Sequence, residues 1–374
     1  MLTWAIDRAR LSEGEVRDRF PDFGDWLTGT AQPTLKQLER FAQATHAAIG
    51  FFFGSEPPDE PLPIPDYRTL SGRGVARPSP DLLDTLYVCQ QRQEWYRQYA
   101  LTIGEPDLSF IGSLDRRTGP SGAASRMRVA LQFDVNKRTR SSRLDDALRQ
   151  FIEQAENIGV LVMVSGVVGS NNNRKLDVEE FRGFAISDAL APVVFINGSD
   201  SKSAQMFTLA HELAHLWLGE SALTDATLRT DGNGASERWC NEVAAELLVP
   251  LQLLKEKHNP TGELSAEMRR LSSEFKVSTL VILRRLHDMG ALSSGKFRTA
   301  YDTELSRLLA LERPSQGGGN FYHTTVARVG RRFARAIIGS TLEGRGSFTE
   351  AFHLLGFKKM SVFDELGHRV GVIG

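Results

Sequence analysis

The residues best suited to chemistry are two histidines and a glutamate in the stretch His211-Glu212-Leu213-Ala214-His215, an H-E-x-x-H motif. Four residues correspond to about 400° of α-helix, so both imidazoles project from one face and can bind one Zn²⁺. Glu212 lies beside them, where it can accept a proton from a water molecule. The motif predicts a zinc site with Glu212 as general base.

The same spacing also fits an ordinary amphipathic helix with two surface histidines. However, the residues flanking the motif are apolar nearly all round the expected helix, Ser203 to Gly219. Two histidines and a glutamate on a buried helix need partners, and a metal ion would supply them. This argument favours the zinc site.

A catalytic zinc site needs a third protein ligand, and the expected helix at 236–250 offers Glu237, Glu242 and Glu246. At about 100° per residue, Glu237 lies within the apolar face, whereas Glu242 and Glu246 point toward water. A carboxylate on a buried face is costly unless paired, so we expect Glu237 to be the third ligand. Asn241, one turn on, is placed to orient a ligand. The alternative is that Glu237 is simply an acid favoured by the dipole at the helix N-terminus.

The surrounding pattern predicts an α+β fold that is mainly helical, with a small sheet. Helical spacing and β-branched or aromatic runs identify the main elements. The expected helices are 81–100, 142–157, 203–219 and 236–257, and the expected strands are 160–168 and 191–197. Within the second strand, Val193 to Asn197 could bind a peptide substrate by edge addition. The sequence singles out no oxyanion-stabilising residue; Tyr322 and His323 are candidates, and packing or a loop surface is the alternative role for both.

The length of 374 residues, with 41% hydrophobic and 24% charged side chains, excludes a single small binding module. The 45 basic and 46 acidic side chains nearly cancel, so the overall charge demands no nucleic acid or anionic membrane as partner. Two cysteines are too few for a disulfide framework. Charges interrupt every apolar run near the N-terminus, and no later apolar stretch is long enough to span a membrane. We therefore expect a cytoplasmic protein.

The stretch APVVFINGSDSKSAQMFTLAHELAHLWLG, followed by SERWCNEVAAELLVP, resembles the ImmA/IrrE family of metallopeptidases over about residues 150–290. The resemblance implies that His211, His215 and Glu237 bind zinc and that Glu212 is the general base. It implies a ligand order similar to that of thermolysin and a zincin-like core. It also implies an endopeptidase that cleaves or regulates a protein partner, such as a transcriptional repressor or a toxin.

The chain departs from the family pattern at one point near the expected ligands. Typical members have Ala-Asn-x-Phe where this chain has Cys240-Asn241-Glu242-Val243. The asparagine is kept, and the cysteine leaves a thiol near the site. This departure concerns the local packing and leaves the expected ligands unchanged.

The N-terminal segment WLTGTAQPTLKQLERFAQATHAAIGFFF resembles helix-turn-helix domains of the Xre class. Yet residues 1–50 carry six basic and seven acidic side chains, whereas a DNA-binding unit usually carries excess positive charge to attract the phosphates. The alternative is a module for dimerisation or substrate docking, so both DNA binding and a homodimer stay open. We expect the divisions to be this unit at 1–53, a Pro-rich linker at 54–70, the peptidase core with preceding helices at 71–260, a second helix-turn-helix-like segment at 261–312 and a C-terminal helical module at 313–374.

Basic side chains in two later segments suggest binding surfaces. Arg328, Arg331, Arg332 and Arg335 have the spacing of one helical face in a segment without acids. We expect this stripe to bind an acidic partner or nucleic acid, and a solvated face is the alternative. In the segment 261–312, a turn precedes a helix with Arg284 and Arg285, although three-helix packing alone would give the same pattern.

Two functions therefore compete. The first is a zinc endopeptidase acting on a protein partner. The second is an antitoxin-like or regulatory protein that binds DNA or protein and keeps a structural or vestigial zinc site. Glu212 discriminates between them, because a purely structural zinc site needs no carboxylate beside an open position.

Overall fold

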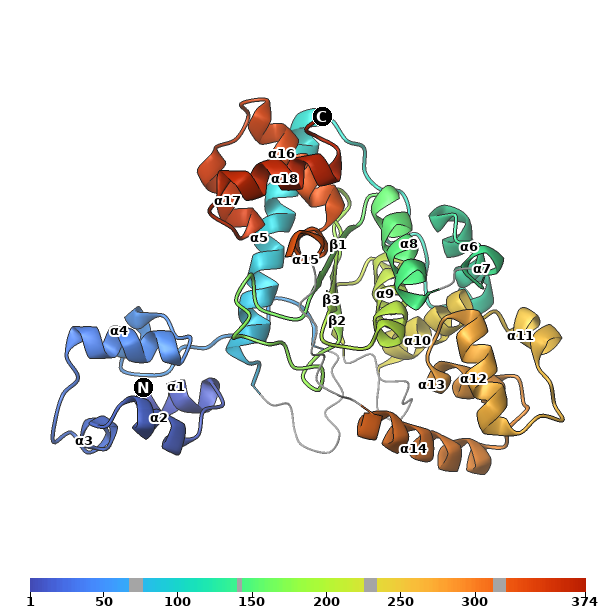
Figure 1. The fold of residues 1–374 in the computed structure, drawn as a ribbon, viewed down its shortest axis with the longest axis horizontal. Helices are drawn as coiled ribbons and strands as arrows, with labels where there is room; N and C mark the ends of the chain where they lie inside the picture. The colour runs from blue at the N-terminus through green and yellow to red at the C-terminus, as the bar shows by residue number, and fades with distance from the viewer. Residues whose placement is uncertain (67–76, 140–142, 225–233, 312–320) are drawn as a thin grey trace. The chain divides into compact units, whose positions relative to one another are not determined.

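A computed structural model describes residues 1–66, 77–139, 143–224, 234–311 and 321–374 (Figure 1). It confirms an α+β fold that is mainly helical and contains a small sheet. The chain divides into two compact units, one containing Met1–Pro63 and the other containing Val88–Gly374. Within the described residues, no helix is both long and apolar enough to cross a membrane.

The N-terminal unit is built from short helices around aromatic side chains. Its elements are α1 (Leu2–Arg8), α2 (Glu13–Arg19), α3 (Phe23–Thr28), α4 (Leu35–Ala44) and the 3₁₀ helix η1 (Ile49–Phe53). Phe23 and Phe41 stack with ring centroids 5.7 Å apart, and neither side chain is exposed. Ser12 and Thr34 begin α2 and α4 with capping boxes, which satisfy backbone N–H groups at each helix start. The unit therefore has its own core, and its helix-turn-helix character stays a prediction.

The second unit contains a four-stranded sheet. Its strands are β1 (Leu161–Ser165), β2 (Gly183–Ile186), β3 (Val193–Asn197) and β4 (Ala222–Thr224), in the order β1-β3-β2-β4. β1 pairs with β3 in parallel, and β2 is antiparallel to both β3 and β4. The expectation that β3 offers a free edge is wrong, because strands on both sides use its backbone hydrogen bonds.

Helices cover both sides of this sheet (Figure 1). Before the metal-site helices come α5 (Pro80–Ile103), α6 (Pro120–Leu131), α7 (Val135–Thr139) and α8 (Leu144–Asn157). The expected helix at 236–257 is two helices, α10 (Ala235–Leu248) and α11 (Leu251–Lys257). Pro250 causes the break, since its ring excludes a helical conformation at the preceding residue and removes a backbone donor.

Helix α9 (Lys202–Leu218) carries the H-E-x-x-H motif through the middle of this unit. The Ser201 side chain accepts a hydrogen bond from the N–H of Ala204 and begins the helix, and Gly219 ends it with φ +73°. Every side chain from Gln205 to Trp217 is buried. The helix packs on α8, α10, β2 and β3, which explains why its sequence is apolar all round.

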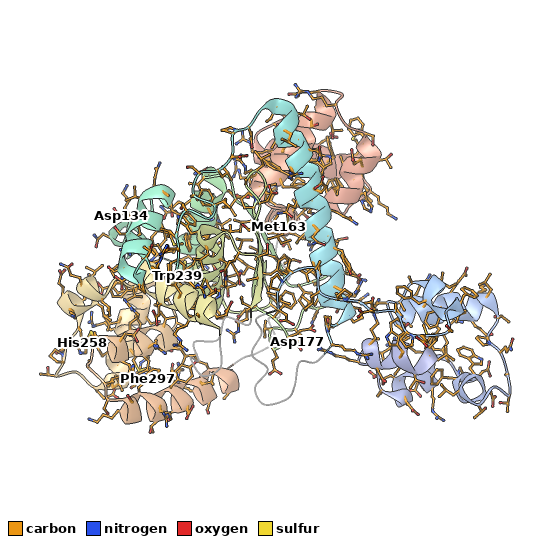
Figure 2. The ribbon with its side chains drawn as sticks, turned by 180° about the vertical axis from the view of Figure 1, so that it is seen from behind. Asp134, Met163, Asp177, Trp239, His258 and Phe297 are labelled. Carbon is orange, nitrogen blue, oxygen red and sulfur yellow. The ribbon has the colours of Figure 1, made fainter. Side chains whose placement is uncertain are left out.

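The later helices form two groups. They are α12 (Leu264–Phe275), α13 (Thr279–Asp288) and α14 (Ser294–Leu311), followed by α15 (Phe321–Val329), α16 (Arg331–Leu342), α17 (Phe348–Leu355) and α18 (Met360–Val370). In the second group, α15 and α16 both contact β1. Arg92 of α5 donates to the carbonyl oxygens of Arg328 and Leu354. Its Nη1 lies 3.5 Å from the sulfur of Met163. Figure 2 labels Met163, which belongs to β1. These contacts fix the C-terminal helices beside the outer strand of the sheet.

The arginine stripe does not lie on one face of one helix, so that expectation is wrong. Gly330 separates α15 from α16 with φ +82°, and a Cβ there would meet the carbonyl oxygen of Val162 at 2.7 Å. Arg332 is not without acids, because its guanidinium lies 3.1 Å from Glu105. The sequence missed this break because the constraint comes from a strand more than 160 residues away.

Candidate metal centre

Helices α9 and α10 bring together the three side chains expected to bind zinc. His211 and His215 lie one turn apart on α9, with their Nε2 atoms 3.1 Å from each other. Glu237, in the first turn of α10, places carboxylate oxygens 3.3 Å from His211 Nε2 and 3.0 Å from His215 Nε2. The exposed fraction is 0% for both histidines and 1% for Glu237. The three groups therefore form a compact buried cluster.

This donor set fits a tetrahedral zinc ion. Two ligands at about 2.0–2.1 Å from such an ion are separated by about 3.3 Å, close to the spacings between the three side chains. Both imidazoles direct a nitrogen toward the same carboxylate, and potential ligand atoms of all three residues lie within 4.8 Å of one another. Two nitrogens and one oxygen also match a catalytic site that keeps a fourth position open. The ligand roles of these residues stay predictions.

Asn241 and Cys240 contact the two histidines from α10. The Nδ1–H of His211 donates to Asn241 Oδ1 at 3.0 Å, which leaves Nε2 as the atom that faces His215 and Glu237. The Cys240 thiol interacts with His215, and burial raises the pKa of this thiol to about 11. Glu220 Oε2 lies 3.9 Å from His215 Nδ1, which is beyond hydrogen-bond range but close enough for electrostatic attraction.

The carboxylate of Glu212 contacts Thr224, whereas the three expected ligands contact one another. Its exposed fraction is 0%, and its Oε1 accepts a hydrogen bond of 2.5 Å from the Thr224 hydroxyl at the end of β4. Oε2 has no hydrogen-bond partner among the described residues. Burial raises the pKa of Glu212, although the nearby histidines oppose this shift. One oxygen is thus held by the protein, and the other can hold a proton.

Gly183 makes room for this carboxylate. A Cβ at this position would meet the Thr208 methyl group at 2.5 Å, the carbonyl oxygen of Phe195 at 2.8 Å and Glu212 Oε1 at 3.2 Å. Sequence reasoning missed both Gly183 and Thr224. They lie on strands of four and three residues, which are too short to show a clear alternation of apolar and polar side chains.

The carboxylate of Glu237 is held in its ionised form. Burial alone would raise its pKa, but His211, through charge and a hydrogen bond, and His215 together lower it to about 2. A carboxylate that stays ionised in a buried site is suited to bind a cation. The dipole of α10 also favours an acid in its first turn. Glu237 therefore has both the buried position expected of a ligand and the favourable position at the helix N-terminus.

The other glutamates of α10 lie away from this cluster. Glu242 is exposed, as its helical phase predicts. The expectation that Glu246 faces water is wrong, because its exposed fraction is only 7% and its carboxylate pairs with Arg285 of α13. Arg285 also donates to the carbonyl oxygen of Val249. This arginine is therefore committed to packing α13 on α10 and is not free to contact DNA.

The remaining candidates lie outside the cluster. Arg331 and Arg335 are exposed, while Arg328 and Arg332 are partly buried. Tyr322 and His323 belong to α15, but their side chains lie outside the described part of the chain. Among the predicted site residues that the structure describes, His211, Glu212, His215, Glu237 and Asn241 therefore lie together in one buried cluster.

Comparison with known proteins finds a similarity to a peptidase family over the residues of this site. Residues 155–287 match the peptidase M78 family model, described as an IrrE N-terminal-like domain, and residues 329–369 match a domain of unknown function, DUF8813. The radiation response metalloprotease IrrE of Deinococcus deserti is 35% identical over 99 residues, covering 24% of this chain and 35% of the relative. The chain thus matches about a third of the length of that relative.

Proposed function

We propose that this protein is a zinc-dependent endopeptidase of the ImmA/IrrE type. The similarity to an IrrE N-terminal-like domain and to a metalloprotease supports the broader class. The observation that carries the specific proposal is Glu212. It is a fully buried carboxylate beside the histidine pair, and Thr224 fixes one of its oxygens while the other stays available.

In this proposal, His211, His215 and Glu237 would hold the ion. When bound, zinc supplies a Lewis acid that polarises a peptide carbonyl and lowers the pKa of water. Glu212 accepts the proton at Oε2 and later passes it to the leaving amine. The Thr224 hydroxyl keeps the carboxylate oriented, and Asn241 keeps the ring of His211 in the correct tautomer.

The raised pKa of Glu212 is consistent with this role. A general base works best when its pKa lies near the operating pH, and burial shifts the carboxyl group in that direction. The surrounding apolar helix also excludes bulk water, which strengthens electrostatic interactions within the site. Burial on α9 therefore serves both the proton transfer and the charge stabilisation.

The test is Glu212→Gln, since an amide cannot accept the proton. The variant should keep zinc and fold but lose cleavage by at least about 100-fold, which is the usual scale of general base catalysis. We would compare wild type and variant in cells that express the genomic neighbour or cognate repressor, and follow fragments of that partner. Glu242→Gln, on the exposed face of α10, is the matched control and should leave cleavage unchanged. Equal activity of wild type and Glu212→Gln would sink the proposal.

A second candidate function is a regulatory or antitoxin-like protein with a structural zinc site. The observation that favours it is the burial of the cluster, since His211, His215 and Glu212 are 0% exposed and structural zinc sites are closed. In that case Glu212→Gln would keep the biological activity of the protein, and no partner fragment would appear.

The partner is proposed to be a protein, such as a transcriptional repressor or a toxin, in the cytoplasm. DNA binding and homodimer formation through the N-terminal unit are alternatives. The N-terminal unit has its own aromatic core. Charge-reversal variants on its surface can therefore test DNA binding and dimer formation while leaving the residues of the metal cluster unchanged.

A further inference from the structure

A cavity of about 600 Å³ lies in the second unit, apart from the metal cluster. Its walls come from α5, the segment after α5, the end of α8 and the start of α16. This volume is within the range of small-molecule sites in proteins, about 300–1,000 Å³. The cavity joins the region matched as IrrE N-terminal-like to the region matched as DUF8813, and neither match assigns it a role.

Part of the cavity wall is a closed network of internal contacts. Arg332 lies 3.1 Å from Glu105, and its guanidinium stands 5.5 Å from the ring centroid of Tyr96. The Tyr96 hydroxyl donates to Glu105 at 3.2 Å. Glu156 accepts the backbone N–H of Arg332 at 3.0 Å. Tyr96, Glu105, Glu156 and Arg332 are thus linked by these contacts along one side of the cavity.

The other charged side chains on the wall make no such ion pair, although the charge and the backbone N–H of Arg331 act on Glu156. Arg331 and Arg335 lie one turn apart on α16, both are exposed, and neither makes an ion pair among the described residues. Glu153, an exposed acid on α8, likewise has no ion pair within the described part of the chain. Tyr99 adds a partly buried ring, which stacks on Trp95 with centroids 5.5 Å apart. Two guanidinium groups, a carboxylate and an aromatic ring therefore share one cavity without binding one another.

This combination selects the chemistry of a ligand. Paired guanidinium groups bind phosphate with strong charge-assisted hydrogen bonds. A carboxylate only accepts hydrogen bonds, so a ligand that contacts Glu153 would have to offer N–H or O–H donors to replace its water. Guanine presents two adjacent N–H donors on one edge, and a tyrosine ring can stack on a base. We propose that this cavity binds a guanine nucleotide, with its phosphates at Arg331 and Arg335 and its base at Tyr99 and Glu153.

Nucleotide bound there would connect α8 with α16. Helix α8 packs on α9, the helix that carries the metal cluster, so the ligand would link the C-terminal helices to the scaffold of the candidate active site. The binding proposal does not depend on peptidase activity. It can therefore fail or succeed separately from the proposed function.

The test is calorimetric titration of the full chain with GTP, ATP and inorganic phosphate at low salt. GTP should bind, ATP should bind at least about tenfold more weakly, and inorganic phosphate should bind weakest because it lacks the base. The double variant R331E/R335E should lose at least about tenfold in GTP affinity, since it replaces attraction to the phosphates with repulsion. Glu153→Gln should reduce the preference for GTP over ATP.

A matched control is R117E/R126E, which changes the net charge equally at two exposed arginines that do not line the cavity. Its GTP affinity should equal that of wild type. Circular dichroism would establish that every variant is folded. No binding of GTP at millimolar concentration, equal affinity for GTP and ATP or inorganic phosphate, or unchanged GTP affinity in R331E/R335E would overturn the proposal.

Discussion

At the scale of single residues, the site depends on residues that are not themselves expected ligands but that position the side chains around them. Thr224 orients Glu212, and Gly183 leaves the space that the Glu212 carboxylate occupies. Asn241 sets the tautomer of His211 by accepting its Nδ1–H at 3.0 Å. Each of these contacts can be removed without removing a ligand, so each gives a separate test of the geometry.

Gly183→Ala should destabilise the protein by about 1–3 kcal/mol, because the added methyl group would overlap the Thr208 methyl group and the Phe195 carbonyl oxygen. Urea denaturation would measure the free energy of unfolding. Gly295→Ala is the matched control, since Gly295 lies in α14 with no atom within 4 Å of a new Cβ, and alanine favours the helix. Equal free energies for the two variants would show that β2 and α9 are not packed as described.

Asn241→Ala should weaken zinc binding by about 10–100-fold, because the ring of His211 loses the acceptor that fixes its orientation. Competition with a chelator of known affinity would measure this change in the folded protein. Asn241→Asp keeps an acceptor oxygen and should restore most of the affinity. Zinc affinity equal to wild type in Asn241→Ala would contradict the orienting role.

At the scale of elements, the sequence predicts those features that depend on neighbouring residues. The spacing of His211 and His215 and the apolar phase of Glu237 could be read because each depends on the geometry of one helix. The water-facing phase assigned to Glu246 was wrong because Arg285 of α13, 39 residues later, reaches its carboxylate and pairs with it. Likewise, β3 is covered on one side by β1 and on the other by β2, and β2 has only four residues, too few to recognise from the sequence.

The ion pair between Glu246 and Arg285 should contribute strongly to the packing of α13 on α10. Arg285→Met leaves a buried carboxylate without its partner and should cost about 3–5 kcal/mol of unfolding free energy. Arg149→Met removes an exposed pair with Asp146 and should cost at most about 1 kcal/mol. Adding Glu246→Gln to Arg285→Met should recover part of the loss. Urea denaturation would measure the free energy of unfolding of each variant. A similar loss in Arg285→Met and Arg149→Met would contradict the burial of Glu246.

At the scale of the whole molecule, the second unit unites the candidate metal centre with the C-terminal helices through a few buried polar contacts. Glu156 is the clearest of these, since this residue of α8 accepts the backbone N–H of Arg332 on α16. Gly330 and Arg92 complete the junction at β1. The N-terminal unit has a separate aromatic core, and its role stays a prediction.

The junction at Glu156 should make stability depend on pH. Burial raises the pKa of Glu156 from 4.5 to about 7, although the N–H groups of Arg332 and Arg331 oppose the shift. The folded state therefore binds a proton more tightly than the unfolded state, and stability is lost as pH rises from about 4.5 through 7. Relative to Glu156→Gln, wild type should lose roughly 1–3 kcal/mol of unfolding free energy between pH 5 and 8.

Urea denaturation across this pH range would measure the difference. The exposed neighbour Glu153 provides the control, and Glu153→Gln should keep most of the wild-type pH dependence. Parallel curves for wild type and Glu156→Gln would mean that Glu156 does not titrate in this range.

The central claim is that α9 and α10 together build one zinc site, and its most direct measurement is zinc content per folded chain. Native mass spectrometry after zinc reconstitution should find about one zinc in wild type, in Glu212→Gln and in the control Glu242→Ala. The double variant H211A/E237A should hold close to none, because it keeps only one of the three ligands. Wild type without zinc, or stoichiometric zinc in H211A/E237A, would contradict the account.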